Sequence, residues 1–185
     1  MLVPPIVCIR PGRPADAASI AGVYVESWRS AYAALLPDAM LVRMSAANHT
    51  RDWAGQLARK RSADGIFVAD LASHGVIGFG SCGPARPTSL PHAGEIFTLY
   101  VAPEHQERGV GRALLLRLAE GLMDRGMGSA LVWVLSRNPS RFFYEAMGGR
   151  KIADKQERLW NGTFRQTAYG WEDLRLIRAR GGEDD

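Results

Sequence analysis

Cysteine is nearly absent from this chain. Two of the 185 residues, Cys8 and Cys82, lie far apart in segments that read as strands. A disulfide framework is therefore not indicated, and the scarcity favours a reducing compartment. We expect both thiols to be buried packing residues. The sequence also lacks a run of about 18 apolar residues and a charged leader before an apolar segment, so it predicts a soluble cytoplasmic protein without membrane contact.

Motifs for several chemistries are missing as well. The four histidines do not fall at metal-ligand spacings with each other or with the cysteines, so no metal is expected. The nucleophile elbow G-x-S-x-G is absent. A Ser–His–Asp triad whose members come together only in the folded chain is still an alternative. The 23 basic and 19 acidic residues give a net charge of +4 without a basic block interleaved with aromatics. This mild charge suits a small anionic ligand, and we expect no nucleic-acid partner.

Apolar periodicity and turn residues divide the chain into strands and helices of one α/β domain, residues 1–177, followed by a polar, disordered tail, 178–185. The 46% hydrophobic content suffices for one core. The loop at 83–94 leads directly into the Glu95 strand, a position from which it would cover an active site. Strands are expected at 6–10, 66–71, 76–82, 95–101, 130–135, 151–160 and 163–171, and helices at 15–36, from Ser45 to about Arg61, at 113–123 and at about 139–147.

The segment from Glu95 to Arg112 is the most informative part of the sequence. A strand is followed by Pro103, a polar turn and Gly109-Val110-Gly111, which opens a long helix. The first N–H groups of a helix lack partners and carry partial positive charge, so they attract anions. Glycine lets a phosphate approach the backbone closely. Arg108 and Arg112 add charge-assisted donors.

The spacing of this loop discriminates between three kinds of phosphate site. The dinucleotide fingerprint needs a small residue where Leu114 stands, and the P-loop needs Gly-Lys-Ser/Thr, which is absent. The remaining pattern, Gln106-x-x-Gly109-x-Gly111 after a strand ending Leu-Tyr-Val-x-Pro, resembles the acyl-CoA pyrophosphate loop of the GNAT-type N-acetyltransferase superfamily.

Two further segments carry the same resemblance. The segment from Asn138 to Gly149, NPSRFFYEAMGG, resembles the second conserved block of the superfamily, with Gly148-Gly149 where many members have Gly-Phe. Ser27-Trp28-Arg29 through Tyr32 to Leu36-Pro37-Asp38 resembles the first-helix region of a bacterial subgroup that acetylates small molecules.

The resemblance implies a single GNAT-like α/β (α+β) domain. Its sheet would be mixed and mostly antiparallel, with about six to seven strands and helices on both faces, opened between the Glu95 and Ala130 strands. The cosubstrate would be acetyl-CoA, without a metal, and the hairpin around Asn161-Gly162 would be a possible homodimer edge. The residues implied to bind the cosubstrate are Leu99, Tyr100, Val101, Gln106, Glu107, Arg108, Gly109, Val110, Gly111, Arg112, Asn138, Arg141 and Phe143.

Two residues are candidates for acid–base catalysis. Glu95 is a carboxylate on an otherwise apolar strand face, and the resemblance suggests a general base acting through water. It would alternatively lie at an exposed edge or pair with an arginine. Tyr144 matches the position whose phenol protonates the departing CoA sulfur, or it is a core tyrosine. Backbone N–H groups near Val101 would stabilise the oxyanion.

The acceptor pocket is assigned to aromatic residues, namely Trp28, Tyr32, Phe97 and Tyr100, although aromatics at helical spacing are also typical of a core. The expected reaction is direct acetyl transfer to a primary amine of a small molecule or peptide in a ternary complex. Two alternatives stay open: a CoA-binding module without catalysis, and a transferase for another acyl-CoA such as succinyl-CoA, which Arg137 or Arg141 would favour. The sequence does not choose among polyamines, amino acids, aminoglycosides and peptide N-termini.

Overall fold

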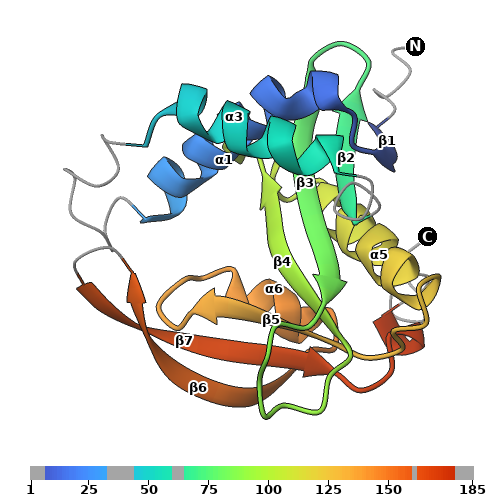
Figure 1. Cartoon of the computed structure of the whole chain (residues 1–185), viewed down its shortest axis with the longest axis vertical. Helices are drawn as coiled ribbons and strands as arrows, with labels where there is room; N and C mark the ends of the chain where they lie inside the picture. The colour runs from blue at the N-terminus through green and yellow to red at the C-terminus, as the bar shows by residue number, and fades with distance from the viewer. Residues whose placement is uncertain (1–6, 33–43, 60–64, 160–161, 178–185) are drawn as a thin grey trace. The chain divides into compact units, whose positions relative to one another are not determined.

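The computed structural model describes residues 7–32, 44–59, 65–159 and 162–177 (Figure 1). Its elements, in chain order, are β1 (Val7–Pro11), η1 (Pro14–Asp16), α1 (Ala17–Tyr32), α3 (Ala46–Ala58), β2 (Ile66–Leu71), β3 (Gly75–Pro84), β4 (Gly94–Val101), η2 (Pro103–His105), α5 (Val110–Met123), β5 (Ala130–Leu135), α6 (Arg141–Ala146), β6 (Arg150–Leu159) and β7 (Gly162–Trp171). None of these helices is long and apolar enough to span a membrane.

The strands form one mixed sheet in the order β1-β2-β3-β4-β5-β7-β6. The β1–β2, β2–β3, β5–β7 and β6–β7 pairs are antiparallel, whereas β4 and β5 are parallel over residues 94–96 and 130–132. The prediction of a mixed, mostly antiparallel sheet of about six to seven strands flanked by helices is therefore confirmed. The chain divides into two compact units: unit 1 is Met1–Ser81 with Thr98–Leu118, and unit 2 is Cys82–Phe97 with Ala119–Asp185.

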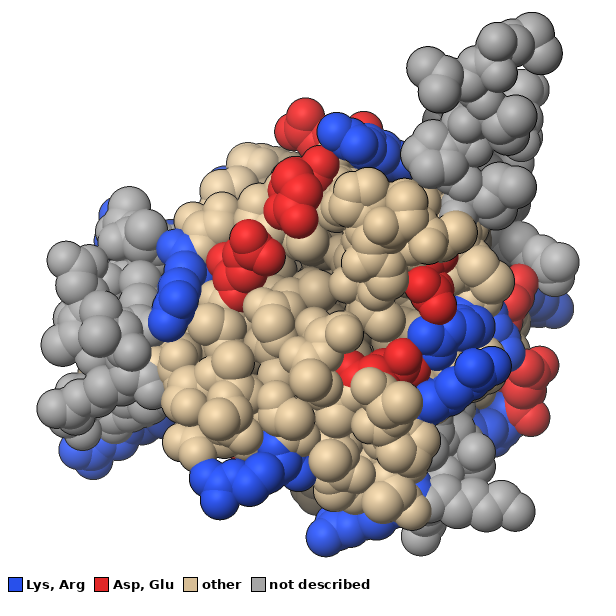
Figure 2. Space-filling model, turned by 90° about the horizontal axis from the view of Figure 1, so that it is seen from above, with Lys and Arg blue, Asp and Glu red and all other residues tan. Residues whose placement is uncertain are grey.

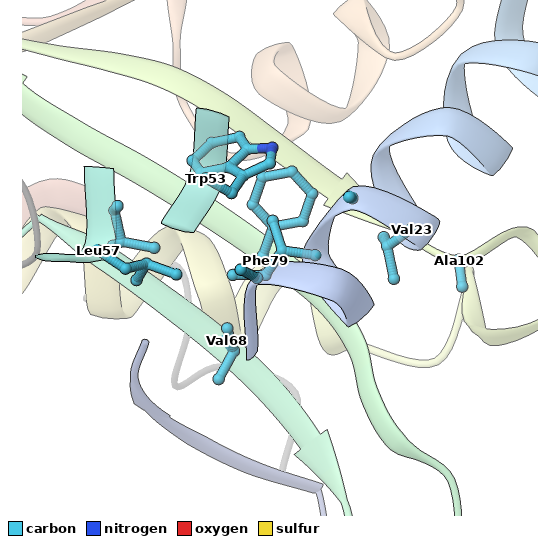
Figure 3. Packing of buried hydrophobic residues seen from close by; sticks show 10 residues of the cluster. Val23, Trp53, Leu57, Val68, Phe79 and Ala102 are labelled. Carbon is cyan, nitrogen blue, oxygen red and sulfur yellow. The ribbon is translucent and has the colours of Figure 1, made fainter. Parts of the chain in front are cut away.

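In unit 1, successive side chains of β3 point to opposite faces of the sheet, and a helix packs on each face. Phe79 points to one face, where its ring packs edge-on against Trp53 of α3 at 5.0 Å between centroids (Figure 3). Gly78 and Gly80 point to the opposite face, where an added Cβ would lie 3.2 Å and 2.6 Å from side-chain atoms of Leu114 and Leu118. The two glycines therefore allow close packing of α5 on β3. This packing holds α5, the helix that follows the glycine loop, in position.

The start of the second helical segment is also as the sequence predicts. Ser45 is the N-cap of α3 and its side chain accepts a hydrogen bond from the backbone N–H of Asn48. A side-chain oxygen at this position satisfies one of the unpaired donors of the first turn. Trp53 and Leu57, one turn apart, then point into the core of unit 1 (Figure 3). The helix is thereby held against β2 and β3.

In unit 2, the turn after α6 is packed against β7. The Trp171 indole N–H donates to the Met147 carbonyl at 3.0 Å, and the Gly149 N–H donates to the Tyr144 carbonyl at 2.8 Å. A Cβ at Gly149 would lie 2.8 Å from the Tyr144 carbonyl oxygen and 2.9 Å from the Trp171 ring. Trp171 therefore fills the space next to this glycine, which gives a physical reason for the second glycine of Gly148-Gly149.

Replacing Gly149 with alanine should consequently destabilise the protein. Because the first obstacle is a backbone oxygen, relief requires the backbone itself to move, at a cost of about 1–3 kcal/mol. Thermal unfolding of Gly149→Ala measures this. Gly128→Ala is the matched control, since a Cβ there would meet nothing within 4 Å. Equal melting temperatures for the two variants would contradict the packing argument.

Some sequence predictions need correction. Both cysteines are free, and Cys82 is buried, but Cys8 is exposed on the terminal strand β1, so its prediction as a buried packing residue is wrong. The fourth predicted helix is shorter than expected: α6 covers Arg141–Ala146 because a turn built on Asn138 precedes it. The predicted tail at 178–185 and Asn161 of the predicted hairpin turn lie outside the described residues.

Candidate functional site

The glycine loop of unit 1 has the backbone geometry of an anion site. Glu107 (φ 59°) and Gly109 (φ 78°) both adopt left-handed conformations on either side of Arg108. Alternation of this kind turns successive N–H groups toward one point, forming a nest. Helix α5 begins at Val110, and the Ala113 N–H donates to the Gly109 carbonyl at 3.0 Å. The N–H groups of the preceding turn therefore have no acceptor within the helix.

The strand end that enters this loop is fixed by side chains. The Val101 carbonyl accepts hydrogen bonds from the Gln106 amide at 2.9 Å and from the buried Ser27 hydroxyl at 3.3 Å. The next N–H, that of Ala102, donates to the Ile77 carbonyl of β3 at 2.8 Å. Because neighbouring residues of a strand direct their backbone groups to opposite edges, the Val101 N–H and C=O point away from β3. Gln106 thus links the loop to the strand end.

Positive charge accompanies the loop. Arg108 is exposed, Arg112 is half-buried in the first turn of α5, and Val110 is buried between them. These two guanidinium groups are the cations nearest in sequence to the nest. Figure 2 shows both Lys and Arg and Asp and Glu side chains at the protein surface.

An aromatic cluster in unit 1 contains two of the predicted acceptor residues. The Trp28 indole N–H donates to the Tyr100 hydroxyl at 2.9 Å, and both side chains are half-buried. Tyr24 packs against Trp28, Tyr100 and His49, with ring centroids 5.6, 5.4 and 4.7 Å away. Tyr32 ends α1, and its side chain lies outside the described residues. Trp28 and Tyr100 are therefore brought together, as part of a packed cluster.

In unit 2, Glu95 forms an ion pair with Arg86 of the loop before β4. The Glu95 side chain is 2% exposed, and all of its hydrogen bonds within the described residues come from Arg86. One oxygen accepts from Nε at 3.0 Å and from Nη2, and the other from Nε at 3.1 Å and the backbone N–H at 3.0 Å. The carboxylate raises the pKa of Arg86, mainly through the side-chain hydrogen bonds. The sequence analysis gave pairing of Glu95 with an arginine as one alternative, and the structure contains that ion pair.

The same loop carries a histidine with two buried, unpaired ring nitrogens among the described residues, His92. Its Nε2 lies against the backbone of Gly170, where an added Cβ would be 2.6 Å away. Burial lowers the pKa of His92 below its ordinary value, and the charge of Glu172 opposes that shift. The folded protein therefore favours the neutral imidazole at this position.

His92 should make stability depend on pH. Because its pKa is lower in the folded than in the unfolded chain, the unfolded chain binds the proton first as pH falls below about 6.5. Stability contributed by the neutral ring is present above that pH and is lost as pH falls toward the folded pKa. The melting temperature of His92→Leu should drop less between pH 7 and pH 5 than that of the wild type. The control His74→Gln, at an exposed site, should follow the wild-type slope. If His92→Leu also followed the wild-type slope, the prediction would be contradicted.

The predicted acid and its neighbours lie on and before α6. Tyr144 is 6% exposed and stacks on Tyr169 with ring centroids 6.4 Å apart. Asn138 is buried, and its side-chain oxygen accepts from the Ser140 N–H at 2.9 Å. This is the ordinary role of an asparagine at a helix start.

The remaining residues predicted in unit 2 are more accessible. The Arg141 guanidinium lies 4.4 Å from the centroid of the Phe142 ring, and Phe143 is half-buried, 5.3 Å from Tyr144 between ring centroids. Phe97 is 40% exposed, with the Arg86 guanidinium carbon 5.7 Å from its ring centroid. Within unit 2 the structure thus groups Phe97 with the Glu95–Arg86 pair, and Arg141 and Phe143 with the Tyr144 helix.

Sequence reasoning did not assign Arg86, Tyr24 or His92 to the site. Arg86 and His92 lie in a proline-containing loop, where no periodicity relates a side chain to its partner. Tyr24 lies one helical turn before Trp28, so the i, i+4 spacing was a signal for that contact. No group of three His, Cys, Asp or Glu side chains able to hold a metal ion occurs in the parts of the chain that the structure describes.

Known proteins resemble this chain in sequence and in fold. The model of the acetyltransferase (GNAT) family matches residues 16–149. An uncharacterised N-acetyltransferase of Bacillus subtilis strain 168, YuaI, is 33% identical over 173 residues, covering 94% of this chain and 97% of that protein.

Two solved structures share the fold and were determined with a ligand. The PaiA N-acetyltransferase of Thermoplasma acidophilum, in complex with coenzyme A, has a TM-score of 0.66 at 21% identity and covers 88% of this chain and 98% of its own. YncA, a putative acetyltransferase of Salmonella typhimurium with acetyl-CoA, has a TM-score of 0.64 at 22% identity, with coverages of 91% and 94%.

Proposed function

Since the chain belongs to the acetyltransferase (GNAT) family and is an N-acetyltransferase, we propose that it transfers the acetyl group of acetyl-CoA to a primary amine of a small molecule or peptide. The amine attacks directly, with both substrates bound. The observation that carries this proposal is the loop between β4 and α5, where Glu107 and Gly109 are left-handed and the helix N-terminus follows at once. This geometry suits a pyrophosphate.

The residues of unit 1 are proposed to hold the cosubstrate. N–H groups of residues 108–112 bind the pyrophosphate oxygens, and Arg108 and Arg112 add charge-assisted hydrogen bonds. The Val101 N–H points away from β3, and we assign that edge of the strand, with Leu99, to the pantetheine amides. The same Val101 N–H is the proposed donor to the oxyanion. Asn138 and, near it in sequence, Arg141 and Phe143 are proposed to contact the remainder of the cosubstrate.

The chemical step forms one C–N bond and breaks one C–S bond. The neutral amine attacks the thioester carbonyl carbon, and the C–S bond breaks when the tetrahedral intermediate collapses. Glu95 receives the amine proton through water, and Tyr144 donates its phenolic proton to the departing sulfur. Trp28, Tyr32, Phe97 and Tyr100 are the proposed contacts of the acceptor. No covalent acyl-enzyme forms, since the amine itself is the nucleophile.

Glu95→Gln tests the proposed base. A free amine has a pKa of about 10, so the need for a base is greatest at low pH. We expect the ratio of wild-type to Glu95→Gln rates to grow as pH falls from 9 to 6, with a loss of about 10²-fold at the acid end. Thiol release measured across this range is the readout. Full activity at every pH would remove Glu95 from this role and leave it as the partner of Arg86.

The proposed function is tested first by ligand binding. Melting temperatures are measured with acetyl-CoA, CoA, succinyl-CoA and NADH in parallel, because a ligand that binds only the folded state must raise the melting temperature. We expect a rise with CoA and acetyl-CoA and none with NADH. Thiol release with a panel of amines then tests turnover. No shift with any CoA ester would contradict the proposal, and a larger shift with succinyl-CoA would redirect it to another acyl group.

A further inference from the structure

The guanidinium of Arg86 is held on one side and open on the other. Its Nε, its Nη2 and the backbone N–H all bind the carboxylate of Glu95, while Nη1 has no acceptor within the described residues. The Arg86 side chain is 65% exposed, although its partner is 2% exposed. A buried carboxylate therefore fixes an exposed cation in one orientation.

A fixed, exposed guanidinium differs from an ordinary surface arginine. The entropy of ordering the long side chain is already lost in the free protein, so an incoming anion does not have to order it. A planar fork also matches carboxylate and phosphate oxygens better than an ammonium does. Phe97 provides an exposed ring beside the same guanidinium, with 5.7 Å from the guanidinium carbon to the ring centroid.

The ion pair with Glu95 neutralises the Arg86 guanidinium overall, but Glu95 occupies only Nε and Nη2, so the Nη1 edge keeps its donors for a further anion. Glu157 also contributes to its raised pKa, but Glu157 is itself ion-paired with Lys155. Arg86 and Glu95 together present a buried proton acceptor next to an exposed cation. The two groups are complementary to a molecule that carries an amine and, a few bonds away, an anion.

We propose that Arg86 determines acceptor specificity by binding an anionic group, a carboxylate or a phosphate, of the amine that is acetylated. This inference rests on the proposed function and on Glu95 as the group that receives the amine proton. The anion lies on Nη1 of Arg86, which directs the neighbouring amine toward Glu95. Polyamines and aminoglycosides are then poor acceptors, because they carry no anionic group for Nη1 to bind.

Matched acceptor pairs test this proposal. Thiol release is measured with alanine and alaninamide, with methionine and methioninamide, and with phosphoethanolamine and ethanolamine, plus spermidine. We expect kcat/KM to be about ten- to hundredfold higher for the anionic member of at least one pair, as for a hydrogen bond to a charged group. The carboxylate and phosphate arms show which anion is preferred. In Arg86→Met the ratio of kcat/KM between the anionic and the neutral member should fall to less than about twofold, mainly through a change in KM. Arg86→Lys should give an intermediate ratio.

A matched control and a second measurement guard against misfolding. Arg165→Met removes an equally exposed arginine of unit 2 that is also ion-paired, to Asp154 at 2.8 Å, and it should leave the preference unchanged. In the wild-type protein with CoA bound, the preferred anionic amine should protect Arg86 from phenylglyoxal, as read by peptide mass spectrometry, and its amide or alcohol counterpart should not. This readout does not require a variant to fold.

The outcomes separate this inference from the proposed function. If amines are acetylated but the neutral or cationic acceptors are preferred, or Arg86→Met lowers kcat/KM equally for both members of each pair, the assignment to Arg86 is wrong and the acetyltransferase reaction stands. If acetyl-CoA raises the melting temperature and no amine is acetylated, the proposed transfer fails and this inference fails with it.

Discussion

Tyr144→Phe should lower kcat by about 10²- to 10⁴-fold, the usual contribution of a general acid. The thiolate of CoA is expelled more easily when a positioned phenol donates a proton, and phenylalanine keeps the ring but not the donor. Because Tyr144 is 6% exposed and packs on Tyr169, the ring should preserve the fold. Steady-state thiol release, with the melting temperature measured on the same sample, gives the result.

Tyr169→Phe is the matched control for this variant. Tyr169 is also buried, and its hydroxyl donates to Glu145 at 2.7 Å, so the substitution removes a phenol from the same ring pair. It should reduce stability by about 1.5–3 kcal/mol, the net value of a hydrogen bond to a charged group, and change kcat by only a few-fold. A normal kcat in Tyr144→Phe with the fold intact would make Tyr144 a core residue.

Gly111→Val should abolish the rise in melting temperature that acetyl-CoA causes. Gly111 lies in the first turn of α5, where the proposed pyrophosphate meets the backbone N–H groups, and the added isopropyl group would occupy that space. At 100 times Kd a bound ligand stabilises by about 2.7 kcal/mol, so its loss is readily measured by thermal unfolding with and without acetyl-CoA.

Gly22→Val separates this effect from a general change in a helix. Gly22 is an exposed position of α1 where an added Cβ would meet nothing within 4 Å. Its variant should show the full shift with acetyl-CoA. If Gly111→Val also retained the full shift, the pyrophosphate could not lie against this turn, and the assignment of the loop would have to be abandoned.

The fold was predictable from the sequence where local pattern and tertiary packing agree. The strands at 66–71 and 130–135 have the predicted bounds, because each is a largely apolar run bounded by turn residues. The helix predicted for 139–147 is shorter in the structure. Pro139 suits a first helical position, but the Asn138 side chain closes a turn there and α6 starts at Arg141. This side-chain hydrogen bond to a backbone N–H two residues on is local, but helix propensity alone does not contain it.

The candidate site was predictable in type but less so in its partners. The glycine loop follows from a strand, a spacing and a helix, which are local in sequence. The pairing of Glu95 with Arg86 depends on how a loop of irregular backbone folds back on β4, and no periodicity encodes that. The aromatic residues Trp28 and Tyr100 were identified, but their hydrogen bond joins residues 72 positions apart, so only the structure reveals it.

Analysis of the products by mass spectrometry tests direct acetyl transfer most decisively. The protein is incubated with acetyl-CoA, first alone and then with the amine that gives the fastest thiol release. The masses of the amine product and of the intact protein are then measured. We predict one acetyl amide for each CoA released, and a protein whose mass is unchanged by acetyl-CoA alone. CoA released without an acetylated amine, or an acetylated protein that transfers its acetyl group when the amine is added, would contradict the mechanism proposed for this chain.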